Sequence, residues 1–81
     1  MSDKEIFEKL VQIVSESLED ESIKDRVSMD TNIFTDLNMN SIAMIYIAMA
    51  IEDTFSIKIN NDDVKNNLTV RDWVNYIKER M

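Results

Sequence analysis

The 81-residue sequence contains no cysteine, histidine, glycine or proline. The lack of cysteine excludes disulfides, thiolate nucleophiles and zinc-thiolate sites. The lack of histidine excludes a Ser-His catalytic pair and most transition-metal sites. Without glycine or proline, every turn depends on Asn, Asp or Ser, which favours helices joined by Asx-type turns over β-hairpins.

Basic residues are also scarce, with nine Lys and Arg against sixteen Asp and Glu and a net charge of −7. No basic face is available for nucleic acid. An acidic surface suits basic protein partners, although solubility alone could also explain the charge. No basic-then-apolar leader opens the chain, so we expect a cytoplasmic location. The longest apolar run, 42–51, is too short to cross a bilayer, so we expect no membrane insertion.

The length predicts a single domain over residues 1–81 with one modest core. Ser2 and Glu5 have the spacing of a capping box, and apolar residues at helical spacing follow as far as Leu18. A closing helix is predicted to start at Thr69 as its N-cap, with Asp72 near the positive end. Its predicted inner face contains Val70, Trp73, Val74 and Ile77.

Between these helices, periodicity lapses over about 22–40, which predicts a long loop pinned by scattered apolar side chains. Asp30-Thr31-Asn32 lacks the glycine and the closing Glu of a calcium loop, so no metal site is predicted. Residues 56–60 are expected to connect helices and to place one or both isoleucines in the core. Residues 61–65 could form a short helical turn.

A helix is predicted from about Ser41 to Phe55, in a region where residues 37–51 carry no charge. One face is typical of a core-facing stripe, at spacings of three and four: Met44, Ile47, Ala48, Ile51 and Phe55. The other face is too apolar for ordinary solvent exposure: Ile42, Ile45, Tyr46 and Met49.

Ser41 stands where the long loop meets this uncharged helix. A helix N-terminus favours a phosphate, because it gathers unpaired N–H groups and a positive dipole end. No base lies nearby in sequence to activate the hydroxyl, so a phosphodiester attachment point suits Ser41 better than a nucleophile. The residue could also be an ordinary helix cap.

The wider pattern resembles the acyl carrier protein family, whose motif reads Asp-Leu-Gly-x-Asp-Ser-Leu before a helix that ends in Leu-Glu-x-x-Phe. The matching stretches are Asp36-Leu37-Asn38-Met39-Asn40-Ser41-Ile42 and Ile51-Glu52-Asp53-Thr54-Phe55. The resemblance covers nearly the whole chain. It implies an all-α four-helix bundle of acyl-carrier type with a long first loop and a short third helix.

The resemblance also implies a function without catalysis. Ser41 would receive 4'-phosphopantetheine from coenzyme A through a phosphopantetheinyl transferase. The thiol of this arm would hold acyl intermediates as thioesters, for acyl-loading and acyl-processing enzymes of fatty-acid, polyketide or related lipid biosynthesis. Tethering gives the cargo a high local concentration at each partner. We expect a monomer.

The sequence departs from the family pattern in four places, and the fourth, the lack of acidic docking residues, points to a specialised carrier. Asn38 replaces a glycine and tolerates a left-handed backbone, whereas Asn40 replaces an aspartate beside the serine. Ile42 for leucine is mild, but Ala43 and Tyr46 stand where acidic docking residues are expected. The expected partner surface contains Met39, Asn40, Ile42, Ala43, Tyr46, Met49 and Glu52.

Three alternatives stay open at this point. The apolar patch around the serine could be covered by the long loop or could line a wider acyl cavity. The chain could be a peptidyl or aminoacyl carrier of the same superfamily. It could also be an unmodified helical adaptor that binds a partner helix through Ile42, Tyr46 and Met49.

Overall fold

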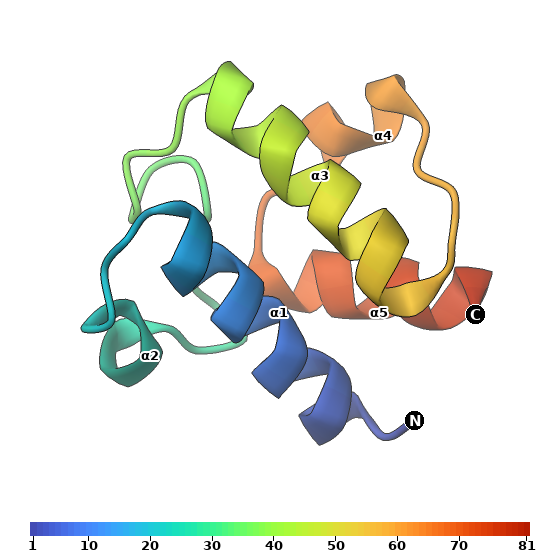
Figure 1. Ribbon diagram of the computed structural model, residues 1–81, viewed down its shortest axis with the longest axis horizontal. Helices are drawn as coiled ribbons and strands as arrows, with labels where there is room; N and C mark the ends of the chain where they lie inside the picture. The colour runs from blue at the N-terminus through green and yellow to red at the C-terminus, as the bar shows by residue number, and fades with distance from the viewer.

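The computed structural model covers residues 1–81 and contains five helices and no β-strand. The helices are α1 (Asp3–Ser17), α2 (Ile23–Arg26), α3 (Ser41–Phe55), α4 (Asn61–Asn66) and α5 (Val70–Arg80). The long helix α1 packs against both α3 and α5, and the short α4 lies beside α3 (Figure 1). The all-α class is therefore confirmed. None of the helices has the length and apolar content needed to cross a membrane.

Capping boxes begin the first and last helices. The sequence predicts the first one as a capping box and the second only as a Thr69 N-cap with Asp72 near the positive end of the helix. The Ser2 hydroxyl accepts the Glu5 N–H at 3.2 Å, and the Ser2 N–H donates to the Glu5 carboxylate at 3.4 Å. Thr69 and Asp72 make the same reciprocal pair at 3.1 Å in both directions. Each box satisfies N–H groups that have no partner inside the helix.

The core lies between α1, α3 and α5 around Trp73, which is fully buried. The predicted inner face of the closing helix is buried throughout, and so is that of α3. Fully burying one such side chain contributes roughly 1.5–3 kcal/mol. Ile57, after α3, is also buried, and Ile59 is half-buried, so this connection supplies apolar side chains to the core as expected.

The long loop between α1 and α3 is held by its backbone as well as by its side chains. The N–H of Ile33 donates to the Leu68 carbonyl at 2.9 Å, and the N–H of Val70 donates to the Thr31 carbonyl at 3.0 Å. Ile23 and Ile33 are fully buried. The loop also contains the four-residue α2, a helical turn that the sequence did not indicate because it is too short for apolar periodicity.

Candidate functional site

The turn that leads into α3 depends on two asparagines. Asn38 adopts a left-handed backbone with φ of 52°, the conformation that this residue type tolerates and that glycine adopts freely. Asn40 is the N-cap of α3, and its side-chain oxygen accepts the Ala43 N–H at 2.8 Å. The cap is therefore Asn40, which leaves Ser41 as the first helical residue.

Ser41 is exposed at this helix start. The Asn40 cap occupies the Ala43 N–H, whereas the N–H groups of Ser41 and Ile42 have no acceptor within the protein. The first turn of α3 contains no acidic residue. An anionic group attached to the Ser41 oxygen would thus meet unpaired donors and the positive end of a four-turn helix.

A hollow of about 340 Å³ opens beside Ser41, between the start of α3 and α4. Its wall is mainly apolar, and α4 contributes one side of it. The lining residues are Phe34, Ser41, Met44, Ile45, Asn61, Val64 and Lys65. This volume is at the lower end of the range for ligand pockets in proteins.

The outer face of α3 is an exposed apolar stripe that begins one residue after Ser41. We call it the α3 stripe; its members, with their exposed fractions, are Ile42 (67%), Ile45 (57%), Tyr46 (66%) and Met49 (56%). The long loop does not cover the stripe, so that part of the alternative is wrong, whereas Ile45 does line the hollow beside Ser41. A second hollow of about 460 Å³ adjoins the stripe and is lined by Ser17, Asn40, Ile42, Ala43 and Tyr46.

Two residues of the expected partner surface have other positions. Met39 is only 5% exposed and belongs to the core, so its predicted place in the exposed patch is wrong. The reason is that Met39 precedes the N-cap, where the turn directs its side chain inward. Glu52 is half-buried, and its carboxylate accepts the Ile59 N–H at 3.0 Å, which braces the connection after α3. The Glu52 carboxylate therefore makes its hydrogen bond within the chain.

Sequence reasoning did not find the polar contacts between α4 and α5. The Tyr76 hydroxyl donates to the Asp63 carboxylate at 2.7 Å, and the Arg80 guanidinium donates to the same carboxylate at 3.1 Å. Burial and this hydrogen bond raise the pKa of Tyr76 above its ordinary value of 10.0. Only the i, i+4 spacing of Tyr76 and Arg80 on one helix face could have hinted at this.

The other perturbed group lies in the turn after α1. The hydroxyl and the N–H of Ser22 donate to the Asp20 carboxylate at 2.5 and 3.0 Å. These bonds, followed by the charge of Arg26, lower the pKa of Asp20 below its ordinary value of 3.8. The arrangement closes a turn. No group of three acidic side chains in the chain could hold a metal ion.

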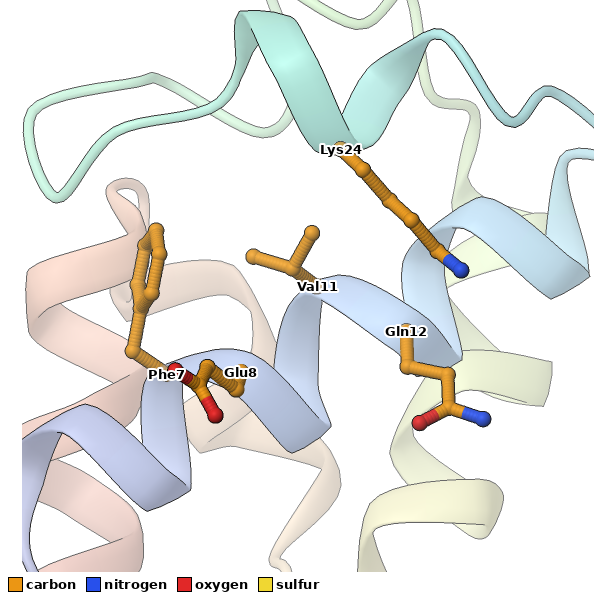
Figure 2. A pocket seen from close by; sticks show the side chains of 5 residues that line it. All are labelled: Phe7, Glu8, Val11, Gln12 and Lys24. Carbon is orange, nitrogen blue, oxygen red and sulfur yellow. The ribbon is translucent and has the colours of Figure 1, made fainter.

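A further hollow of about 270 Å³ lies between α1 and α2. Figure 2 shows Phe7 and Val11 pointing from α1 towards α2, with Lys24 reaching back from α2. Glu8 and Gln12 complete the lining, and their polar ends point away from the hollow. The hollow contains no serine, so it offers no hydroxyl for a phosphodiester.

Comparison with known proteins agrees with this geometry. The family model described as a phosphopantetheine attachment site matches residues 8–77. The chain is 36% identical over 78 residues to an acyl carrier protein of Lactobacillus johnsonii, covering 96% of this chain and 95% of the relative. It is 41% identical over 76 residues to an acyl carrier protein of Beutenbergia cavernae, covering 94% and 90%. The solved structure of the acyl carrier protein from Enterococcus faecalis matches with a TM-score of 0.80 and 31% identity over the full length of both chains.

Proposed function

This chain belongs to the acyl carrier protein family, and we propose that Ser41 is the residue that bears its phosphopantetheine arm. Members of this family carry acyl intermediates on a covalently attached 4'-phosphopantetheine and are not catalysts themselves. Their partners are phosphopantetheinyl transferases and acyl-processing enzymes. The proposal concerns which residues of this chain perform these tasks.

The observation that carries the assignment is the position of Ser41 in the first turn of α3. The residue is exposed, and two unpaired N–H groups adjoin it. A phosphodiester there carries a negative charge, which the helix dipole stabilises by about 0.3–1 kcal/mol. No side chain in the first turn of α3 offers a general base, so the transferase must activate the hydroxyl.

The hollow between α3 and α4 supports a role in holding cargo. An arm that starts at Ser41 begins at the rim of this hollow, since Ser41 is one of its lining residues. Met44, Ile45 and Val64 supply apolar surface inside it. Burying acyl methylenes against such surface is favourable by about 0.8 kcal/mol each, so the start of an acyl chain fits this site.

The proposed docking surface for the partner enzymes is the α3 stripe. Any enzyme that acts on the arm has to approach Ser41, and the stripe follows Ser41 along the same helix. The stripe carries no charge, so its occupant is an apolar surface on the transferase or on an acyl-processing enzyme. This is the basis for proposing a specialised carrier. The position of the stripe also supports a monomer, because a second copy of the chain bound to the stripe would crowd Ser41.

Mass spectrometry of the intact protein tests the attachment site. After incubation with coenzyme A and a broad-specificity phosphopantetheinyl transferase, the wild type should gain the mass of one arm. Ser41→Ala should gain none. Ser17→Ala is the matched control, because Ser17 is an exposed serine that adjoins the stripe from α1, and it should be modified normally. Modification of Ser41→Ala would refute the assignment.

A further inference from the structure

The short helix α4 has little apolar attachment to the rest of the fold. None of its six residues is buried, and Val64 is its one side chain that packs against the core. A helix this short is not stable by itself in water, so other contacts must hold it in place.

Those contacts come from α5 and converge on Asp63. Its carboxylate accepts from Tyr76 and Arg80, while the Tyr76 oxygen accepts the Asn60 N–H at 3.4 Å. The Arg80 guanidinium also lies 4.3 Å from the centre of the Tyr76 ring, and Trp73 meets that ring edge-on at 5.8 Å. Contacts within α5 therefore hold the Tyr76 ring and the Arg80 guanidinium in place, independently of their contacts with α4.

The ion pair in this group is the most sheltered of the four in the protein. The side chains of Arg80 and Asp63 are 36% and 30% exposed, whereas those of the other three pairs are 43–78% exposed. Shelter from water strengthens both the ion pair and the hydrogen bond from the phenol. The contacts around Asp63 can thus hold α4 in place, whereas the three more exposed ion pairs contribute little to stability.

Asp63 and Val64 are adjacent on α4 and so project about 100° apart around the helix. Asp63 contacts α5, whereas Val64, with Asn61 and Lys65, lines the hollow beside Ser41. The contacts that Asp63 makes with α5 consequently set the position of Val64 and of the wall that α4 forms beside the hollow.

From this arrangement we infer that Tyr76 and Arg80 are positioning residues. They hold α4 as the movable wall of the hollow beside Ser41. They thereby determine the length of chain that the hollow admits. The inference rests on the proposed role of Ser41 for its cargo, but the contacts themselves do not depend on it. The hollow of about 340 Å³ admits a short acyl group as it stands. A longer one enters when α4 moves outward, which requires the Asp63 contacts to open.

Hydrogen exchange on the unmodified protein tests the contacts. In Tyr76→Phe, which keeps the ring and removes the hydroxyl, the amides of residues 63–67 should exchange about 5- to 20-fold faster. Core amides of α1 and α5 should be unchanged. Arg80→Gln should act in the same direction. Tyr46→Phe is the matched control, because it removes a hydroxyl from an exposed tyrosine of α3, and it should leave α4 exchange unaltered. Unaltered α4 exchange in both Tyr76→Phe and Arg80→Gln would overturn the inference.

The effect on cargo is measured on protein loaded from acetyl- or octanoyl-coenzyme A. The readout is the rate at which hydroxylamine cleaves the thioester, followed by intact mass. In Tyr76→Phe the octanoyl thioester should be cleaved about 3- to 10-fold more slowly than in the wild type, because opening of α4 is easier. The acetyl thioester should be cleaved at the wild-type rate. Equal effects on both chains, or none on octanoyl, would overturn the inference. Failure of the wild type to accept any arm would instead refute the role of Ser41 and leave the exchange result valid.

Discussion

Replacing Tyr46 by Glu is the sharpest test of the proposed docking surface. Tyr46 lies one turn after Ser41 and is 66% exposed, so the fold does not depend on its ring. Glutamate is a good helix former, and the thermal melt should therefore change little. The variant places a charge in the middle of the α3 stripe, where a partner would have to bury it.

The expected loss follows from the area that the ring exposes. An aromatic side chain buries about 150–250 Å² when fully covered, so the exposed part of Tyr46 offers roughly 130 Å². At about 25 cal/mol per Å² this amounts to ~3 kcal/mol, which is an upper bound because binding also orders the side chain. We expect a loss of about 1–3 kcal/mol, or roughly 5- to 150-fold in affinity.

The assay is kcat/KM for arm transfer by the phosphopantetheinyl transferase of the same organism, together with affinity for an acyl-processing partner. Both are measured at about 0.05 M and about 0.2 M salt. Wild-type values should change little with salt, since the stripe is uncharged. Asn75→Glu is the matched control, because it introduces the same charge at an exposed position of α5. It should behave as the wild type does.

A steep salt dependence of the wild type, with Tyr46→Glu harmless, would show ordinary electrostatic docking and would refute the reasoning. The reciprocal experiment uses an enzyme that recognises acidic carriers. Such an enzyme should bind the wild type poorly and an Ala43→Glu, Tyr46→Glu double variant better, because the double variant supplies the missing negative charges.

Three further predictions concern the helix start, the net charge and the perturbed phenol. Asn40→Ala should lower the free energy of unfolding by about 1 kcal/mol in chemical denaturation, through loss of the α3 cap. Asn40→Asp keeps the cap and should preserve stability while speeding transfer by a generic transferase. Thermal melts of the wild type at neutral pH should rise with salt, because the net charge of −7 repels itself; a flat or falling series would contradict this. The contacts that raise the pKa of Tyr76 favour its protonated phenol, so they stabilise the fold below pH 10.0. This stabilisation should be lost as pH rises above that value, and Tyr76→Phe should lose less stability there. In Tyr46→Phe, the one remaining tyrosine should titrate by absorbance above 10.0.

Local chemistry made the three long helices and their starts predictable. The spacing of Ser2 and Glu5 predicts a capping box, and Thr69 predicts an N-cap, because each feature involves a single turn of chain. The reciprocal bond that makes Thr69 and Asp72 a second capping box is a finding of the structure. The core face of α3 followed from periodicity for the same reason. The left-handed backbone of Asn38 agrees with the family pattern, which has a glycine at this position, and with the tolerance of asparagine for that conformation.

Side-chain burial next to an element boundary was less predictable. Met39 stands two residues before Ser41 and is predicted to belong to the partner surface, yet it is buried in the core. Helical periodicity assigns faces only to residues inside the helix, so the direction of a residue before the N-cap depends on how the turn packs. The sequence does not predict the helical turn α2 for a related reason, because four residues are too few to show helical periodicity.

By itself the sequence determined the all-α class, the boundaries of the uncharged helix and the place of Ser41 at its start. Each depends on residues within about one turn of one another, where spacing fixes geometry. Only the tertiary structure decided that the α3 stripe is uncovered, that Glu52 braces a loop and that Asp63 meets Tyr76 and Arg80. These contacts join elements whose relative placement comes from packing of the shared core, and no local pattern along the chain specifies that placement.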